Sequence, residues 1–177
     1  MERDRALEPD TLTGAIPLDI SNRLASPVPA TTPLLLARYL RVRTGESLHM
    51  RLRATAGIYY VIRGAGESTY QTDRLAWSQG DIFRIPGGGE TIHCADRDAV
   101  LWVVSNEPEV AFHRLEPPAT NLEGLAVVHF PAREIREHLN DVRARPDQKD
   151  ASGKVVVFAT TDFEKMLSLT PFNDIGS

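Results

Sequence analysis

The sequence predicts an all-β fold, a barrel or sandwich of short strands, followed by a short α-containing C-terminal extension. Between residues 34 and 118, runs rich in β-branched and aromatic residues recur at the spacing that is typical of such folds. Turns rich in glycine, proline or aspartate separate the runs, and in one run apolar and polar residues strictly alternate. These observations divide the chain into an N-terminal arm (1–33), a barrel (34–118) and a C-terminal extension or linker (119–177).

The arm is expected to be mostly extended, because five prolines occur in it and each restricts its own and the preceding backbone. Residues 16–20 of the arm carry alternating apolar side chains that could pair with the barrel or dock on it. The first barrel strand is expected at 34–43, ending at the turn 44–46. In the strand that follows, Leu48, Met50 and Leu52 alternate with His49, Arg51 and Arg53.

The middle of the barrel is a series of short segments with the composition of strands. Glycines at 64–66 end the first of them, and a turn at 72–73 joins the next two into a hairpin. Residues 96–98 are interpreted as a turn between two strands, and prolines at 117–118 end the last one. The segments expected to form strands are 57–63, 69–71, 75–77, 82–85, 91–95, 99–104 and 110–115.

The extension is predicted to mix short strands and helices. Residues 125–130 form an apolar run, and Pro131 suits the first turn of a helix. Apolar residues then recur at i, i+4 and i+7 as far as Val142, which is the pattern of one buried helix face. A buried strand is expected at 155–158, and a second short helix, opened by a capping box, at 161–167.

Composition and charge exclude several classes of protein. The 177 residues carry a net charge of −4, and no Lys/Arg-rich run favours nucleic acid as a partner. No apolar stretch approaches the roughly 20 residues that a membrane span needs, and residues 1–5 lack the apolar core of a signal peptide. The single cysteine, Cys94, cannot form an internal disulfide, so a reducing, cytoplasmic location is expected.

Two segments resemble the motifs of a known family. The first is GIYYVIRGAG at 57–66, and the second is GDIFRIPGGGETIH at 80–93. Together they resemble the two signature motifs of the cupin superfamily, whose members are small β-barrels that usually hold one metal ion. The resemblance implies a cupin double-stranded β-helix, which is a jelly-roll barrel, for residues 34–118.

The order and spacing of the segments 16–19, 29–37, 59–64 and 76–83 are similar to those of gentisate 1,2-dioxygenase-like bicupins. Those proteins carry two cupin barrels on one chain, and often only one barrel binds iron. The resemblance extends over most of the sequence and corresponds to the first, metal-poor barrel and the linker. It implies that a second barrel with a His-x-His motif would follow near residue 170, close to where this sequence ends.

The metal ligands of the family have no equivalents at the matching positions. The spacing of the first motif puts Arg51 and Arg53 where the family has two histidines, and Gly57 where it has a glutamate. In the second motif the histidine position is Thr91, and His93 lies two residues further along the same strand face. Arginine has no lone pair to donate, and a catalytic metal needs three or four donors. No metal is therefore expected in this chain, and Fe(II) only in a partner barrel or at a non-standard site.

The candidate ligand-binding residues are Arg51, Arg53, Tyr59, Thr91 and His93, and no catalytic residue is assigned. The two arginines could clamp a carboxylate inside the barrel, although their alternation with leucines favours the solvent-exposed face of a half-buried strand. Tyr59 could stack on an aromatic substrate or belong to the core. His93 could bind a ligand or relay a proton, but a hydrogen-bonded histidine inside the barrel is favoured.

Three functions remain open, and the sequence names no substrate. The favoured one is a metal-free structural half or subunit, related to ring-cleaving dioxygenases of gentisate type, that pairs with a metal-bearing cupin barrel. The second is a module that binds a small aromatic or organic acid through Arg51, Arg53 and His93. The third is a stand-alone, metal-dependent dioxygenase whose non-standard site uses His49 and His93. A homodimer, or pairing with a second cupin barrel, is expected because the apolar arm and residues 34–36 invite a β partner.

Overall fold

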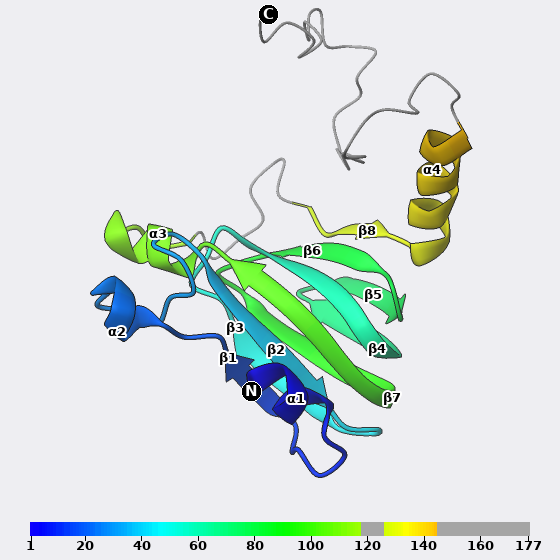
Figure 1. The fold of residues 1–177 in the computed structure, drawn as a ribbon, viewed down its shortest axis with the longest axis horizontal. Coiled ribbons are helices and arrows are strands. Elements are labelled where there is room, and N and C mark those ends of the chain that lie inside the picture. Colours follow the sequence, from blue (N-terminus) through cyan, green and yellow to red (C-terminus); the bar gives the residue numbers. More distant parts are fainter. Residues whose placement is uncertain (118–125, 145–177) are drawn as a thin grey trace, which may run out of the picture.

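The computed structural model describes residues 1–117 and 126–144, in which eight strands and four helices form an antiparallel β fold (Figure 1). This architecture confirms the predicted all-β class with a short helical part. The helices are α1 (Glu2–Leu7), α2 (Ser21–Leu24), α3 (Glu107–Phe112) and α4 (Ala132–Ala144). The strands are β1 (Gly14–Pro17), β2 (Leu36–Val42), β3 (Ser47–Arg51), β4 (Ala56–Tyr70), β5 (Asp73–Ser78), β6 (Ile82–Pro86), β7 (Glu90–Ser105) and β8 (Val128–Phe130).

The two long strands β4 and β7 lie at the centre of the sheet, whose strand order is β1-β2-β7-β4-β6-β8. The two strands pair with each other, and on its other edge each strand changes neighbour midway along its length. One half of β7 pairs with β3 and the other half with β2, while β4 pairs first with β6 and then with β5. The sheet therefore consists of two halves that share β4 and β7, and the halves enclose the core between them.

Both central strands are longer than the sequence suggested. A break at 64–66 and a turn at 96–98 were expected, but β4 and β7 run through these positions without ending. The chain absorbs the irregularity as register shifts between Val61 and Gly66, because a bulge bends a strand without terminating it. Gly64 has a φ of +93°, a conformation that glycine adopts without steric cost.

The segment 110–115, which was expected to be a strand, instead overlaps the helix α3. Pro108 lies in the first turn of this helix, where its missing N–H costs nothing. Glu107 and Glu109 place negative charge at the same end, which the helix dipole favours. Val110 is buried, so the apolar residue that suggested a strand serves as the inward side of a short helix.

The N-terminal arm is not extended throughout, because it contains α1 and α2. Both helices lie in stretches free of proline, α1 before Pro9 and α2 between Pro17 and Pro27. Between them, β1 pairs with β2 and buries Ile16, so the expected docking of this segment on the barrel is confirmed. The division of the chain into arm, barrel and extension stays a prediction.

The space between the two halves of the sheet is filled by one hydrophobic cluster. Its largest members are aromatic or branched side chains that come from six different strands or the turns beside them. A second, smaller cluster lies on the other side of the sheet, where Ala6 of α1 packs near Ile16 and Val100. The main cluster contains Leu40, Val42, Leu52, Ala54, Tyr59, Val61, Tyr70, Trp77, Phe83, Ile85, Ala95, Ala99, Leu101 and Val103.

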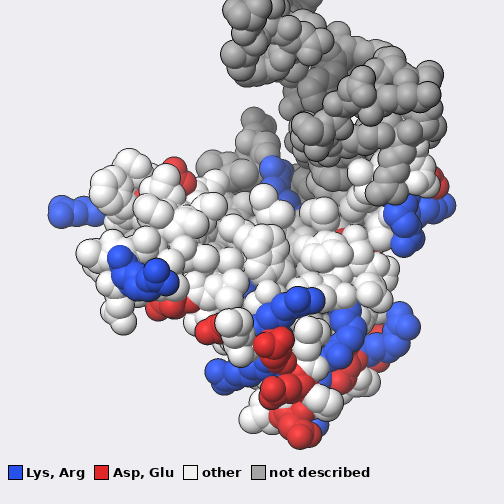
Figure 2. All heavy atoms as spheres, viewed as in Figure 1, with Lys and Arg blue, Asp and Glu red and all other residues white. Residues whose placement is uncertain are grey.

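The outward side of β4 and β7 carries exposed apolar side chains, which we call the outer apolar face. It consists of Ile58, Tyr60 and Trp102, which are 56%, 42% and 36% exposed. Tyr60 and Trp102 are direct cross-strand partners, so the side chains are neighbours on the sheet. Figure 2 shows few charged side chains over the middle of the molecule, whereas acidic and basic side chains gather at its lower end, around α1.

Two of the apolar residues that were expected to invite a partner are already covered within the chain. Ile16 and Leu36 are buried, whereas Leu34 and Leu35 remain partly exposed. Leu34 and Leu35 therefore remain accessible to a partner at the arm, and the outer apolar face is a second exposed apolar feature.

The beginning of the extension agrees with the sequence. A strand, β8, pairs with β6, and the helix α4 follows Pro131 as predicted. Asp81 ties this segment to the barrel, because its Oδ1 accepts a hydrogen bond from the backbone N–H of Ala132 at 2.7 Å. The predicted strand at 155–158 and helix at 161–167 lie outside the described residues. No helix among the residues described is long and apolar enough to cross a membrane.

Candidate functional site

A short chain of polar groups crosses the otherwise apolar barrel interior. The indole N–H of Trp77 donates a hydrogen bond to Ser68 Oγ at 2.8 Å, and this oxygen lies 2.7 Å from His93 Nδ1. Ser68 and His93 are direct cross-strand partners on β4 and β7, which is why the two side chains meet. The arrangement favours a Ser68 hydroxyl that donates to Nδ1, leaving the imidazole proton on Nε2.

His93 is fully buried, and its environment keeps it neutral. Burial lowers the pKa of His93 to about 4, because the imidazolium would lose its hydration inside the barrel. Nε2 has no hydrogen-bond partner within the described residues. The predicted hydrogen-bonded histidine inside the barrel is thus what the structure contains, with one ring nitrogen still unpaired.

Tyr59 is packed beside His93, as a member of the core. Its ring stacks on Phe83 with a centroid distance of 4.8 Å and lies 5.2 Å from the His93 ring. Burial raises the pKa of the Tyr59 hydroxyl well above its usual value; the charge of Glu107 adds to this effect and that of Arg38 opposes it. This hydroxyl, like His93 Nε2, has no partner in the part of the chain that is described.

The five predicted site residues divide into two groups. Tyr59, Thr91 and His93 are buried in the barrel interior, so the structure brings these three together. Arg51 and Arg53 are exposed, which agrees with the favoured interpretation of a solvent-exposed strand face. Neither arginine joins His93.

The positions counted from the first motif, Arg51 and Arg53, therefore do not point into the barrel. The inward-facing residues of β3 are Leu48 and Met50, which pack against the core, followed by the buried Leu52. Met50 lies opposite Thr91 across the sheet, so a thioether and a hydroxyl occupy the centre of the barrel there. Neither group is the imidazole or carboxylate that typically holds a catalytic iron.

His49 does not complete a site with His93. It lies on the exposed side of β3, with Nδ1 3.3 Å from a Glu90 oxygen, while His93 points into the core. Among residues 1–117 and 126–144, no group of three or more His, Cys, Asp or Glu side chains is placed to hold a metal ion. The donor set in this part of the barrel does not fit an iron site.

A pocket of about 470 Å³ opens beside α3, at the end of the barrel, and we call it the mouth pocket. Its wall contains Arg38, which lies on the same strand face as the core residue Leu40 and directly across from Val103. Arg38 Nη2 is 2.6 Å from Glu107 Oε2, which also accepts a hydrogen bond from Ser105. The remaining lining is apolar except for two arginines and one glutamate: Val28, Pro29, Leu36, Arg53, Val110, Ala111, Arg114, Leu115 and Glu116.

Charge in the mouth pocket favours an anionic ligand. Three arginines and two glutamates line the pocket, and Arg53 is paired with the exposed Glu116. Such an exposed pair contributes little, so the Arg53 guanidinium remains available to a ligand. Arg53 is thus the one predicted site residue that lines this pocket.

The sequence did not point to Arg38, Glu107 or Arg114 as site residues. A signal for Arg38 existed, because a charged residue interrupts an apolar strand face between Leu36 and Leu40. Glu107 belongs to a helix that was expected to be a strand. Arg114 has a left-handed backbone with a φ of 54°, and nothing in the local sequence predicts this.

Comparison with known proteins identifies solved structures with a similar fold. No family model matches the chain. Its sequence is 30% identical over 79 residues to the 5-aminosalicylate 1,2-dioxygenase of Comamonas sp., a match that covers 44% of this chain and 21% of that protein. The structure of salicylate 1,2-dioxygenase from Pseudoaminobacter salicylatoxidans, as adducts with gentisate, matches 63% of this chain with a TM-score of 0.51 and 21% identity. A further structure of that enzyme covers 64% of the chain, with a TM-score of 0.50 and 19% identity.

These likenesses confirm the predicted cupin fold and the resemblance to gentisate 1,2-dioxygenase-like proteins. Over the matched 79 residues the sequence is related to that of an aminosalicylate dioxygenase. The match covers 33% of the solved salicylate dioxygenase chain, so the protein described here corresponds to about a third of that relative.

Proposed function

We propose that this cupin barrel works without a metal of its own, as a structural half or subunit beside a metal-bearing cupin barrel of an aromatic ring-cleaving dioxygenase. One observation carries the proposal: Leu48, Met50 and Leu52 face inward on and just after β3, in the segment where the resembling family carries two histidine ligands. Apolar side chains pack tightly there, and His93 offers a single imidazole. Such an interior supports a stable scaffold better than a redox centre.

The outer apolar face supports the pairing part of the proposal. Ile58, Tyr60 and Trp102 lie together on the outward side of the sheet, and aromatic residues of this kind are enriched where proteins meet. A second barrel that covered this face would remove the exposed rings from water. We propose that the partner is a metal-bearing cupin barrel; a second copy of this chain is the alternative outcome of the same measurement.

Metal analysis tests the proposal directly. The purified protein, incubated with Fe(II) under anaerobic conditions and then desalted, is expected to retain far less than one iron per chain. It is also expected to show no ring cleavage of gentisate by itself. Stoichiometric, tightly bound iron together with gentisate cleavage by this chain alone would overturn the proposal.

The mouth pocket favours a second candidate function, the binding of a small aromatic or organic acid. Arg38 and Arg53 supply guanidinium groups that can hold a carboxylate, and the apolar lining suits a ring. The two relatives are named for salicylate and 5-aminosalicylate, and the first was solved with gentisate, which supports a hydroxybenzoate as the first ligand to test.

A thermal-shift screen of hydroxybenzoates and dicarboxylates tests this second function. A specific ligand raises the melting temperature of the wild-type protein by mass action. For Arg53→Gln, about tenfold more ligand is expected to be needed to reach the same shift in melting temperature. Arg51→Gln is the matched control, since Arg51 is also exposed but does not line the pocket. Equal loss in both variants, or no shift with any acid, would count against this function.

A further inference from the structure

A second hollow lies beside Pro9, just after α1, and is lined by residues of β4 and β7. It has a volume of about 410 Å³, and we call it the corner pocket. It is lined by Pro9, Arg63, Gly64, Gln79, Arg97 and Asp98. None of these residues belongs to the barrel interior or to the mouth pocket.

The corner pocket is located where β4 and β7 lose their regular pairing. The register shifts fall between Val61 and Gly66 on β4 and between Leu101 and Ala95 on β7, which includes the pocket residues of both strands. Bulges of this kind redirect side chains and are common beside binding sites. Gly64 is required at this corner, because a Cβ there would lie 2.5 Å from the Asp98 carbonyl oxygen.

Within the described ranges, neither basic group of the corner pocket forms an ion pair. Arg63 Nε is buried and makes no hydrogen bond within the described residues. Arg97 is exposed and has no ion-pair partner among residues 1–117 and 126–144. Two guanidinium groups thus line one hollow without a carboxylate of their own.

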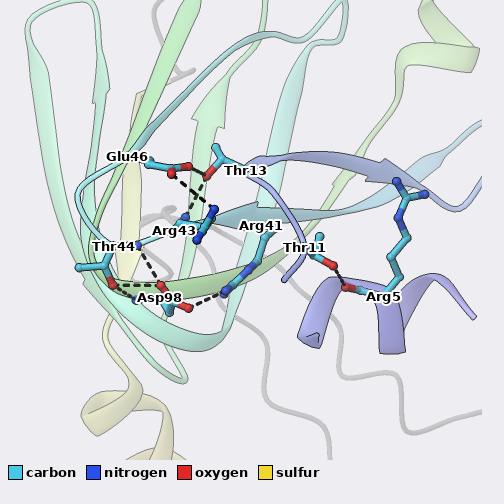
Figure 3. Close-up of polar contacts among 8 residues, drawn as sticks. All are labelled: Arg5, Thr11, Thr13, Arg41, Arg43, Thr44, Glu46 and Asp98. Carbon is cyan, nitrogen blue, oxygen red and sulfur yellow. Dashed lines mark hydrogen bonds and ion pairs between the residues drawn. The ribbon is translucent and has the colours of Figure 1, made fainter. Parts of the chain in front are cut away.

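The only acid in the described lining, Asp98, is already satisfied. Its Oδ2 lies 2.5 Å from Arg41 Nη2, and its Oδ1 accepts hydrogen bonds from the backbone and the hydroxyl of Thr44 (Figure 3). Arg41 is fully buried behind Asp98, and its Nε and Nη1 have no partner in the part of the chain that the structure describes. Arg63 and Arg97 therefore share the pocket with a carboxylate that Arg41 already neutralises, which leaves an excess of positive charge at the pocket.

We propose that the corner pocket binds a small oxyanion of the phosphate type. A guanidinium group can donate two parallel hydrogen bonds to two oxygens of such an anion. The two positive charges of Arg63 and Arg97 would balance the double negative charge of the anion. The Gln79 side chain can add a neutral donor. Because the pocket opens to solvent, either free phosphate or the phosphoryl group of a larger molecule can enter. This site is independent of the proposed pairing and of the mouth pocket.

The first test compares the stabilising effect of inorganic phosphate with that of chloride at equal ionic strength. Phosphate, and sulfate as its analogue, is expected to raise the melting temperature of the wild-type protein well beyond the effect of chloride. Arg97→Gln is expected to weaken phosphate binding about tenfold, because it removes one charge-assisted contact. Because Arg97 is exposed, its replacement is expected to leave folding intact, and Arg63→Gln provides an independent second variant.

Arg51→Gln serves as the matched control, because it removes an exposed arginine that does not line the corner pocket. It is expected to leave the phosphate effect unchanged. A ³¹P NMR titration with inorganic phosphate and with phenyl phosphate then separates the two sources. Stronger binding of phenyl phosphate identifies a phosphorylated molecule, and equal or stronger binding of phosphate identifies the free ion.

Two results would overturn the proposal. One is a phosphate effect no larger than that of chloride in the wild-type protein. The other is an equal loss of the phosphate effect in Arg51→Gln and Arg97→Gln, since binding would then depend on overall charge. Neither result bears on iron content or on hydroxybenzoate binding, so the proposed function and this inference can fail separately.

Discussion

At the scale of single residues, the barrel interior shows how one polar side chain is accommodated in an apolar core. His93 is held by Ser68, and Ser68 is in turn held by the Trp77 indole. Each added hydrogen bond lowers the cost of burying the group before it. The imidazole is tolerated only because it stays neutral, and this makes the stability of the fold depend on pH.

Replacing His93 by Asn should flatten the pH dependence of stability between pH 6.5 and pH 4. In the unfolded chain, His93 takes up a proton near its ordinary pKa of 6.5, whereas in the folded protein its pKa is about 4. The unfolded state therefore binds more protons in this window, and folding stability is lost as the pH falls through it. The difference corresponds to about 3 kcal/mol.

Urea denaturation at pH 7, 5.5 and 4.5 measures this effect in the wild-type protein and in His93→Asn. All other titrating groups are shared, so the difference between the two slopes isolates His93. The stability of the variant at pH 7 is expected to be lower because its smaller side chain leaves a cavity. Parallel pH profiles would show that burial does not hold His93 neutral.

At the scale of secondary-structure elements, the sequence predicted individual strands and helices better than it predicted where one long strand continues. The strand β2, the β4–β5 hairpin, β6 and α4 agree with their hydrophobic patterns, because those patterns report which face is buried. The patterns failed at 64–66 and 96–98, where glycines and aspartates are also typical turn residues. Only the pairing of β4 with β7 determines that a bulge forms there, and this pairing is not local.

The glycine at the bulge supplies a test of this account. Gly64→Ala should destabilise the protein by at least about 2 kcal/mol, because alanine is strained at positive φ. In addition, the new Cβ would lie 2.6 Å from Ala99 Cα, in rigid backbone. Gly14→Ala is the matched control, since no atom lies within 4 Å of a Cβ built at Gly14.

Chemical denaturation of both glycine variants at pH 7 gives the comparison. The Gly14 variant is expected to stay within about 0.5 kcal/mol of the wild-type protein. Similar losses in both variants would mean that the corner formed by β4 and β7 can relax, and the bulge would then not require glycine.

At the scale of the whole molecule, the sequence identified the fold but not the surfaces that give it a function. The cupin motifs fixed the kind of barrel, because their spacing reflects turns and buried strands. The mouth pocket depends on Arg38 and Glu107, which lie far apart in sequence and meet only after β2 and β7 pair. The outward placement of Arg51 and Arg53 has a related cause, since the pairing of a strand decides which of its faces is buried, and a shift of one residue turns every side chain to the other face.

The outer apolar face supplies the prediction for assembly. Trp102→Glu should weaken association with a partner barrel, or with a second copy of the chain, by at least tenfold, because it places a charge at the centre of the face. Folding should be little affected, since Trp102 is partly exposed. Phe112→Glu is the matched control, because Phe112 is an exposed aromatic residue on α3, outside this face.

Analytical ultracentrifugation over a range of protein concentrations, with and without a metal-bearing cupin barrel, measures this association. The wild-type protein and Phe112→Glu are expected to behave alike. A wild-type protein that remains monomeric in both experiments, or a Trp102→Glu variant that still associates, would remove the outer apolar face as an interface.

The partnership of β4 with β7 also bears on how the chain reaches its native state. The two strands are separated by β5 and β6, and their pairing extends from Gly57 with Ser105 to Tyr70 with Thr91. The chain loses conformational entropy when it brings these distant strands together, before their contacts can stabilise it. A topology of this kind therefore folds slowly for its size. A nascent chain in which β7 has not yet been synthesised would expose one long unpaired edge of β4. This edge is where the protein most needs protection from aggregation during synthesis.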